Sequence, residues 1–321
     1  MSFKPIHVNE QPRFQGIATF MRLPYVTEPH GLDVALLGVP YDAGQYSTCS
    51  GARFGPRAVR NSSVRVRLYN QSLGLSPYEY LNVADCGDVS FNPLRADWSH
   101  RAITEQVDRF VDAGVIPLCV GGDHTISHPL LRAIGRRHRP VGLVHFDAHS
   151  DTADEDLGMR ELGHGTPFRR AIEEGLVDPK RTIQVGVRSI ENAEEWDYPR
   201  EQGVELITLD DVVTHGIEWV AGRFQRLLGG PIYVSIDIDV LDPAFAPASC
   251  PNPGGLTSRE LMFLIRKLLG HHVVGGDIVE LNAPYDLPTD PTSCLVAYLL
   301  FDMLCLCTHG RKPLKARLAE A

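Results

Sequence analysis

Short apolar runs alternate with longer amphipathic segments along the 321-residue chain. The runs are rich in Val, Ile and Leu without polar alternation, which is typical of strands buried on both faces of a sheet. They predict strands over residues 34–39, 115–120, 142–146, 182–187, 232–236 and 273–279. The segments between them predict helices over residues 56–67, 99–113, 127–138, 167–174, 218–228, 258–269 and 293–306.

Two of the predicted helices carry local start signals. Pro56 falls in the first turn of its helix, where the missing N–H costs no hydrogen bond. Thr257 and Glu260 have the spacing of a capping box. Buried strands that alternate with helices predict a mostly parallel sheet with helices on both faces. No linker, repeat or low-complexity stretch divides the sequence, so we expect one domain over residues 1–321.

The composition, 43% hydrophobic and 22% charged, is ordinary for a globular protein. A formal net charge of −9 disfavours nucleic acid as a partner. The apolar run 294–307 is too short to cross a bilayer, and the N-terminal segment lacks the apolar core of a secretory signal. Seven cysteines without a CxxC pair predict free thiols. We therefore expect a soluble cytoplasmic protein with no membrane partner.

Three polar clusters directly follow three of the predicted strands. Their sequences are VGGDHTISH from residue 120, HFDAHSD from residue 145 and SIDIDVLDP from residue 235. The carboxyl ends of parallel strands lie at one edge of the sheet, where open α/β sheets bind their ligands. We therefore expect the three clusters to meet there.

Six residues of these clusters are candidate metal ligands. In the second and third clusters they recur at every second position, and alternate residues of a strand point the same way. The set is His124, Asp147, His149, Asp151, Asp237 and Asp239. Four carboxylates packed together repel one another strongly, and two divalent cations would cancel their charge. Mixed carboxylate and imidazole ligands suit Mn, Fe, Co, Ni or Zn better than Ca. One such cluster alone is often structural, whereas three in matching positions predict a two-metal site.

The motifs GGDH, HFDAHSD, GHGTPF and SIDIDVLDPAFAP, in this order and spacing, resemble the ureohydrolase family of arginase, agmatinase and guanidino-acid hydrolases. PRFQGIATFMRLP and GARFGPRAVR are most similar to the guanidinobutyrase and guanidinopropionase branch. The resemblance covers most of the chain. It implies a three-layer α/β/α sandwich with a mostly parallel eight-stranded, arginase-like sheet. It also implies a guanidine-type small-molecule substrate and assembly into homotrimers or homohexamers.

The resemblance also implies how two ions share the six ligands. One ion takes His124, Asp147, Asp151 and Asp237, and the other takes Asp147, His149, Asp237 and Asp239, so that Asp147 and Asp237 bridge. The family's ions are usually Mn²⁺, and some members use Ni²⁺. His128 and His145 are interpreted as core or supporting residues, and Asp123 as a residue that orients a ligand.

Two further residues match the family's catalytic machinery. His164 in GHGTPF resembles its proton-shuttling histidine, a role that the ordinary pKa of histidine suits. Glu280 in DIVELNAPYD matches its guanidinium-binding glutamate, because a carboxylate can accept two parallel N–H bonds from that planar cation. The alternatives are a loop histidine bonded to a backbone carbonyl and a salt-bridged glutamate.

Two loops depart from the family pattern. Residues 40–56 read PYDAGQYSTCSGARFGP, where relatives read roughly PxDGGTTNRPGARFGP, so the Asn-Arg pair that could hold a carboxylate tail is missing. Residues 246–255 read APASCPNPGG, one residue shorter than the relatives' APGTGTPExGG. The candidate substrate-loop residues are Tyr46, Thr48, Cys49, Cys250 and Asn252.

These departures favour a dinuclear-metal amidinohydrolase whose substrate lacks a carboxylate. Free guanidine, an alkylguanidine or a biguanide such as metformin would be cleaved at a C–N bond, with release of urea or of an amine plus a urea derivative. If the two loops differ from the family without a change of substrate, the alternative is an ordinary hydrolase of 4-guanidinobutanoate or 3-guanidinopropanoate, or an agmatinase. Formiminoglutamate hydrolysis is another reaction of the same fold. An alternative of another class is a non-catalytic subunit that joins an active paralogue in a hetero-oligomer.

Overall fold

The computed structural model describes residues 3–160, 163–227 and 229–320. Its eight strands form one sheet in the order β2-β1-β3-β8-β7-β4-β5-β6, and every neighbouring pair is parallel. The strands are β1 (Val34–Val39), β2 (Val83–Asp88), β3 (Ile116–Gly121), β4 (Val141–Phe146), β5 (Val177–Val187), β6 (Glu205–Thr208), β7 (Pro231–Asp237) and β8 (His272–Val279).

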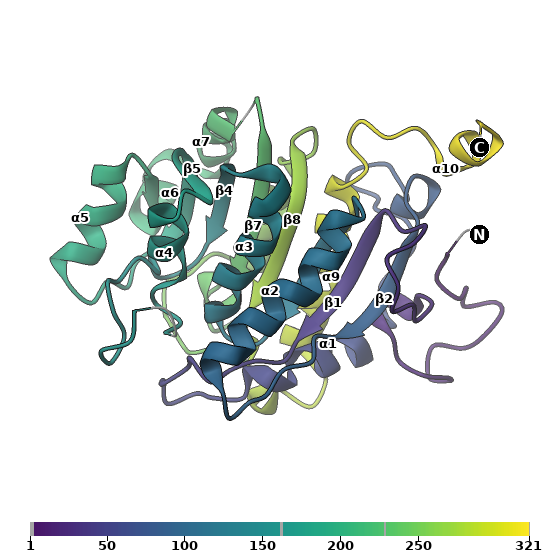
Figure 1. Cartoon of the computed structure of the whole chain (residues 1–321), viewed down its shortest axis with the longest axis horizontal. Helices are drawn as coiled ribbons and strands as arrows, with labels where there is room; N and C mark the ends of the chain where they lie inside the picture. The colour runs from purple at the N-terminus through teal and green to yellow at the C-terminus, as the bar shows by residue number, and fades with distance from the viewer. Residues whose placement is uncertain (1–2, 161–162, 228, 321) are drawn as a thin grey trace.

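Helices cover both faces of this sheet. They are α1 (Gly55–Ser63), α2 (Ala96–Asp112), α3 (Ser127–His138), α4 (Pro167–Glu173), α5 (Ala193–Gln202), α6 (Leu209–His215), α7 (Ile217–Arg223), α8 (Ser258–Arg266), α9 (Pro291–Leu306) and α10 (Leu314–Glu320). Helices α2, α3 and α4 pack on one face, with α2 and α3 side by side in front of the sheet in Figure 1, and α1, α7, α8 and α9 pack on the other. The expected three-layer α/β/α sandwich is confirmed.

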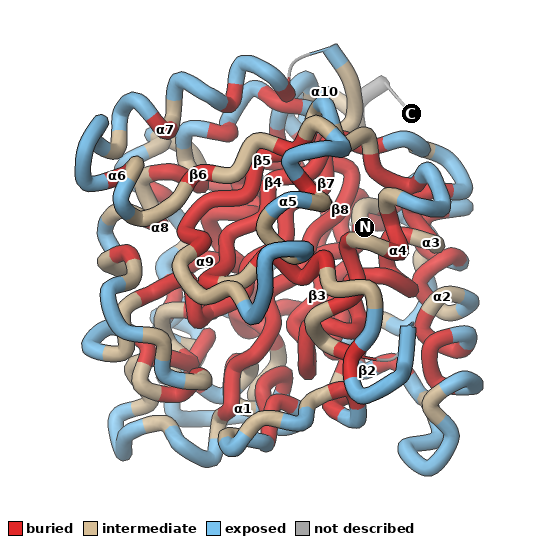
Figure 2. The backbone as a smooth tube through the Cα atoms, turned by 90° about the vertical axis from the view of Figure 1, so that its left-hand side faces the viewer, coloured by how far each residue is buried: buried red, intermediate tan, exposed pale blue. Residues whose placement is uncertain are grey.

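Alternation along each strand supplies the two cores. Val34 and Leu36 of β1 belong to the core beneath α1, α8 and α9, whereas Ala35 and Leu37 belong to the core beneath α2, α3 and α4. Because both faces are covered, both sets of alternating positions along such a strand are mostly apolar. Figure 2 shows these strands as a buried centre inside exposed outer segments.

The two strands that the hydrophobic pattern did not predict are both at edges of the sheet. β2 has the sequence VADCGD, and its buried Asp85 is paired with Arg60 rather than with apolar neighbours. β6 has only four residues, three of them partly exposed. Edge strands bury less surface, so their apolar pattern is weaker. β5 also begins at Val177, five residues before the prediction, with an irregularity in its pairing to β4.

Several helices differ from the predicted bounds. The helix predicted from residue 56 ends at Ser63, and the one predicted over 218–228 ends at Arg223 and continues as the 3-10 turn Phe224–Leu227. Residue 228 lies outside the described residues.

The helix starts predicted from local signals agree with the structure more closely than the predicted helix ends do. The first-turn position of Pro56 and the capping box of Thr257 with Glu260 are confirmed. The pattern did not predict α5, α6 or α10. Thr208 and Asp211 form a capping box at the start of α6, and their spacing in the sequence is a signal that could have found it.

The strand order places β3, β8, β7 and β4 next to one another. The chain builds β1 to β3 on one side, crosses to β4, moves outward through β5 and β6, and returns to the middle with β7 and β8. The carboxyl ends of the four central strands therefore surround the point where the strand order reverses, which is the usual ligand site of such sheets. Among the described helices, none combines the length and apolarity needed to span a bilayer.

Candidate active site

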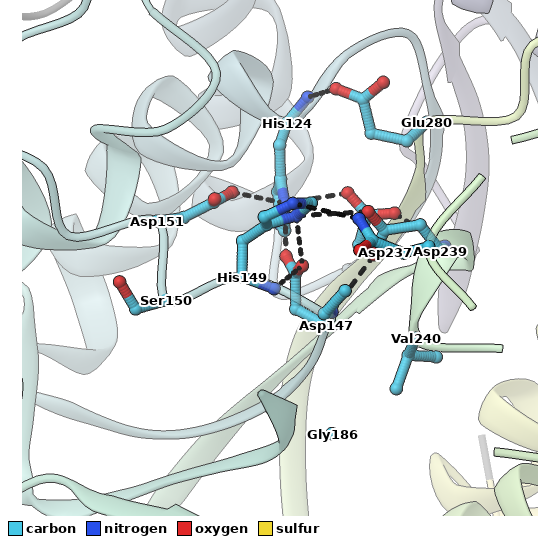
Figure 3. Close-up of polar contacts among 12 residues, drawn as sticks. His124, Asp147, His149, Ser150, Asp151, Gly186, Asp237, Asp239, Val240 and Glu280 are labelled. Carbon is cyan, nitrogen blue, oxygen red and sulfur yellow. Dashed lines mark hydrogen bonds and ion pairs between the residues drawn. The ribbon is translucent and has the colours of Figure 1, made fainter. Parts of the chain in front are cut away.

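The six residues predicted as metal ligands come together at this point, as Figure 3 shows. His124 opens a 3-10 turn just after β3, and Asp237 is the last residue of β7, with Asp239 in the 3-10 turn that follows. The other three lie on the loop after β4: Asp147, His149 and Asp151. Five of the six are buried, and His149 is partly exposed.

His124 lies at the centre of three carboxylates. Its Nδ1 is 2.8 Å from Asp151 Oδ2, 3.1 Å from Asp147 Oδ2 and 3.4 Å from Asp237 Oδ2. This nitrogen is buried and makes no hydrogen bond. A buried polar atom without a partner is costly. A cation held by these residues would give this nitrogen a partner.

The opposite side of the ring explains which nitrogen faces the carboxylates. His124 Nε2 is 2.9 Å from Ser235 Oγ, and Ser235 in turn donates its hydroxyl to Asp277 Oδ1 at 2.6 Å. Because the serine proton points to Asp277, the serine oxygen accepts Nε2–H. The lone pair of Nδ1 is then left for a metal ion, and this kind of support is usual around metal-ligating histidines.

A second group of ligand atoms adjoins the first through Asp147. His149 Nδ1 is 3.3 Å from Asp147 Oδ1 and 3.1 Å from Asp239 Oδ2. Asp147 thus presents one oxygen to each histidine, which fits a carboxylate that bridges two ions. His149 Nε2 is 3.1 Å from the Asn252 side-chain amide.

The pKa values of two of the acids reflect how closely the carboxylates are crowded. Burial and the charges of Asp239 and Asp147 raise the pKa of Asp237 well above its ordinary value. Burial and Asp147 raise the pKa of Asp151 in the same way. Carboxylates so crowded bind protons unless cations take their place.

His145 supports the cluster from below. It is fully buried, and its Nε2 is 2.8 Å from Asp147 Oδ2. Gln184 donates from Nε2 to His145 Nδ1 at 2.9 Å, which leaves the imidazole proton on Nε2, facing Asp147. His128, the other histidine interpreted as a core residue, pairs with Glu174.

Glu280 and His164 lie beside the cluster and contact each other. Glu280 follows β8 with a φ of +62°, a left-handed conformation that is unusual for this residue and is typical of strained functional sites. Its Oε1 accepts the backbone N–H of His124 at 3.0 Å and lies 3.2 Å from His164 Nδ1. Burial by itself would lower the pKa of His164. The hydrogen bond to Glu280 and its negative charge outweigh burial and raise the pKa to about 9.

Two glycines allow close contacts beside His164 and beside His124. A Cβ on Gly163 would come within 2.1 Å of Asp156 Oδ2, so the GHG motif lets this carboxylate approach the backbone on either side of His164, where it accepts the Gly165 N–H. A Cβ on Gly122 would come within 1.6 Å of the Tyr41 carbonyl oxygen. Gly122 therefore lets the loop 40–56 pack against the end of β3.

Asp123 holds the same loop and the turn that contains His124. Its carboxylate accepts the backbone N–H groups of Thr125 at 3.1 Å and Gly44 at 2.8 Å. Burial and Glu280 raise its pKa to about 7. Asp123 thus positions His124 through the backbone.

A cavity of about 570 Å³ opens above the cluster. Tyr46 and Cys250 line it, as expected of substrate-loop residues. Thr48 is exposed, and Cys49 is half-buried next to the Cys250 thiol. Asn252 contacts His149 instead of lining the cavity. The structure thus brings only part of the predicted substrate set to the cavity wall.

Acidic side chains dominate the outer part of this cavity. Besides the cluster and Glu280, its lining includes Glu155, Asp156, Glu191 and Glu195, and none of the described lining residues is lysine or arginine. The nearby Arg188 donates to the backbone carbonyls of Asp239 and Asn252, both at 2.7 Å, so its charge is already used. A cavity with this lining attracts cations.

Five residues that support the site are not predicted from the sequence pattern: Gln45, Gln184, Arg188, Ser235 and Asp277. Ser235 and Asp277 interrupt otherwise apolar strand runs, and a buried polar residue in such a run needs a partner. That signal is visible in the sequence. The partners themselves are not, because they lie on different strands.

The parallel sheet with a His/Asp cluster at its central strand ends is typical of an α/β enzyme with a metal site. The model of the arginase family matches residues 32–305, and this chain belongs to that family. The family binds two Mn²⁺ ions, and the described clusters are able to bind metal.

The relatives of this chain are amidinohydrolases. It is 46% identical to a guanidinopropionase and 45% identical to a guanidinobutyrase, both of Pseudomonas aeruginosa. Each alignment covers 94% of this chain, and 95% and 96% of the two relatives. The solved proclavaminate amidino hydrolase of Streptomyces clavuligerus superimposes with a TM-score of 0.89 at 37% identity, over 93% of this chain and 99% of that one.

Proposed function

We propose that this protein hydrolyses a C–N bond of a guanidine-type substrate that carries no carboxylate tail. The observation that carries this proposal is the acidic lining of the cavity above the His/Asp cluster, without a lysine or arginine among the described lining residues. Free guanidine, alkylguanidines and biguanides such as metformin meet this description.

The geometry and the family resemblance support the proposed ligand sets. His124, Asp147, Asp151 and Asp237 would hold one ion, and Asp147, His149, Asp237 and Asp239 would hold the other. The unpartnered Nδ1 of His124 among three carboxylates supports this assignment. Mn²⁺ is the first choice of ion and Ni²⁺ the second. Such a pair of ions supplies hydroxide near neutral pH.

Glu280 and His164 act on the substrate. The Glu280 carboxylate accepts two N–H groups of the planar cation and so orients its central carbon. His164 is protonated at neutral pH because its pKa is raised to about 9. It can therefore give a proton to the departing nitrogen, which is a poor leaving group as an amide anion.

The cavity wall decides between substrate tails. A carboxylate tail would be desolvated beside Glu191 and Glu195 without a cation to pair with, which is costly. A neutral tail avoids this cost, and a cationic tail is attracted. The missing Asn-Arg pair of the loop 40–56 supports the same preference.

The names of the relatives favour a second candidate. Guanidinopropionase and guanidinobutyrase are named for guanidino acids, and an agmatinase of Gallus gallus is 43% identical to this chain. An ordinary guanidino-acid hydrolase or agmatinase is supported by these names at least as well as the first candidate is by the cavity. The substrates of the second candidate carry a charged tail, a carboxylate in the guanidino acids and an amine in agmatine, which guanidine, alkylguanidines and metformin lack.

A kinetic panel separates the candidates. The purified chain is loaded with Mn²⁺ or Ni²⁺ and offered guanidine, methylguanidine, metformin, agmatine, 4-guanidinobutanoate and 3-guanidinopropanoate, with release of urea and amine measured. We expect guanidine, methylguanidine or metformin to exceed both acids in kcat/KM by at least about tenfold, equivalent to about 1.4 kcal/mol. A guanidino acid or agmatine at the top of the panel refutes the first candidate. No turnover by the chain alone, restored by a paralogue, supports a partner subunit instead.

We further propose that the protein forms homotrimers or homohexamers in the cytoplasm, with a hetero-oligomer as the alternative. All seven cysteines are free thiols, which suits a reducing compartment. Light scattering tests the assembly, because the chain has a mass of 35.5 kDa.

A further inference from the structure

Tyr46 links the altered loop 40–56 to the segment that carries His164. Its hydroxyl donates to Asp156 Oδ1 at 3.1 Å. The other carboxylate oxygen of Asp156 accepts the backbone N–H of Gly165, the residue after His164, at 2.8 Å. One buried carboxylate therefore ties the tyrosine to the backbone beside the histidine.

The ring of Tyr46 makes a second contact, with the imidazole of His164 itself. The two rings are 4.8 Å apart between centroids and nearly perpendicular, at 81°. This edge-to-face arrangement is favourable for aromatic rings. Glu280 holds the same imidazole, because its Oε1 lies 3.2 Å from His164 Nδ1. Tyr46 and Glu280 thus hold His164 together, one by packing and the other by a hydrogen bond.

The segment around His164 gives the histidine little rigidity of its own. His164 lies between Gly163 and Gly165, outside any helix or strand, and glycine has the least restricted backbone. A proton donor must meet one nitrogen of the substrate, and a misplacement of about 1 Å can cost about 10²-fold in rate. A residue that restrains this imidazole therefore contributes to kcat without contacting the reacting atoms.

The place of Tyr46 in the loop connects this support with the kind of substrate. Tyr46 stands in the part of the loop 40–56 where the family resemblance leads one to expect the Asn-Arg pair. A substrate without a long tail offers little binding energy away from its reacting carbon, so the protein must supply the orientation of the reacting groups by itself. A loop that holds the proton donor suits such a substrate.

We propose that Tyr46 is a positioning residue that holds His164 toward the substrate, by packing on its ring and by binding Asp156. This inference rests on the proposed function and extends it. The loop 40–56 then supports the proton donor in this protein instead of gripping a carboxylate tail. The competing role is a direct contact with the substrate, because Tyr46 lines the cavity and is 54% exposed.

Two substitutions separate the two contacts of Tyr46. Tyr46→Phe keeps the ring against His164 and removes the hydroxyl that binds Asp156. Tyr46→Leu removes the ring as well. Tyr69→Leu makes the same change at a tyrosine of similar exposure that does not line the cavity, and it is the matched control.

The first measurement is kcat and KM of the metal-loaded enzymes with the best substrate of the panel. For Tyr46→Leu we expect kcat to fall by about tenfold or more, with KM within about twofold of the parent, because the donor is misplaced and the substrate contacts remain. Tyr46→Phe should retain most of the ring contact and lose only about threefold in kcat. Tyr69→Leu should match the parent.

The second measurement combines Tyr46→Leu with His164→Ala. If Tyr46 acts through His164, its loss should change kcat by less than about twofold once the imidazole is gone, because two groups that act as a unit are not additive. A residue that only maintains the structure would lower kcat by the same factor in both backgrounds.

Crystal structures of the metal-loaded Tyr46→Leu and Tyr69→Leu variants give a readout that does not depend on turnover. In Tyr46→Leu we expect the His164 ring to turn away from Glu280 or to occupy more than one rotamer. In Tyr69→Leu we expect a single rotamer with Nδ1 toward Glu280.

Three outcomes overturn the inference and leave the proposed function standing. A rise in KM with kcat unchanged means that Tyr46 contacts the substrate instead. Equal losses of kcat with and without His164 mean that its role is only structural. An unmoved His164 in the Tyr46→Leu crystal means that other groups hold the ring. If the parent hydrolyses no member of the panel, the proposed function fails, and the role of Tyr46 in it fails too.

Discussion

The floor of the cavity and its mouth are built in different ways. The floor, defined as the six His and Asp residues of the cluster, stands at or just after the ends of three central strands. The mouth, defined as the loops 40–56 and 246–255 with the acidic side chains of the outer wall, is partly exposed and lies on loops. A sheet fixes the directions of the floor side chains, whereas loops can change at the mouth without disturbing the core.

This difference teaches where chemistry and selectivity are encoded. The six residues of the floor match the family resemblance, so we expect the class of reaction to be retained. The mouth lacks the Asn-Arg pair that the resemblance leads one to expect, so we expect the substrate tail to be the variable part. Changes to the floor should therefore affect every substrate, and changes to the mouth should affect some substrates more than others.

The largest effect is expected at the shared ligand of the floor. Asp147→Asn removes a carboxylate that faces both His124 and His149. We expect activity on every substrate to fall to background and the metal content, measured by mass spectrometry, to drop below that of the parent. Asp112→Asn, which changes an exposed acid at the end of α2, serves as the control. Full activity of the Asp147→Asn variant would show that the cluster takes no part in the reaction.

The next effect is expected at His164. His164→Ala should lower kcat by about 10²-fold, the scale of a positioned acid or base, with KM little changed. Because the pKa of this histidine is raised to about 9, its acid form is present at neutral pH and is lost as the pH rises through that value. The parent should therefore show an alkaline fall in kcat that the variant lacks. If added imidazole does not rescue the variant and the alkaline fall persists, another group supplies the proton.

A smaller effect is expected from the support beneath the floor. Asp277 accepts hydroxyl groups from Ser235, Tyr233 and Ser127, and through Ser235 it sets the proton of His124. Asp277→Asn should weaken metal binding by about 10- to 100-fold, the usual range for such supporting residues. Tyr233→Phe removes one of the three hydroxyls and leaves Ser235 in place, so it should bind metal more tightly than Asp277→Asn. Equal metal dissociation constants for the two variants, measured by titration, would contradict this difference in metal affinity.

The smallest effect is expected at the mouth. Glu155 lines the cavity and is exposed, so Glu155→Gln should lower kcat/KM by only about two- to threefold for a cationic substrate, and less at high salt. Neutral-tailed substrates should change less, and 4-guanidinobutanoate should improve slightly. Glu79→Gln, on the distant turn Pro77–Glu79, is the control. A loss that is equal for all substrates would place Glu155 in the catalytic machinery instead.

The sequence by itself determined the floor and the central sheet. Asp147, His149 and Asp151 are fixed by a two-residue period that continues directly from a buried strand, and apolar runs mark every central strand because both of its faces are covered. The edge strands β2 and β6 are not predicted by the hydrophobic pattern, because an edge strand buries less surface and tolerates residues such as Asp85.

Only the tertiary structure decided which residues support and surround the floor. Gln45 and Glu280 are 235 positions apart, and Ser235 meets Asp277 across neighbouring strands. Local propensity carries no record of such contacts, because they arise when the strand order reverses and brings β8 and β7 back between β3 and β4. The acids of the outer wall come from the loop after β4 and from the segment after β5 that leads into α5, so the charge of the cavity is a property of the fold rather than of any one segment.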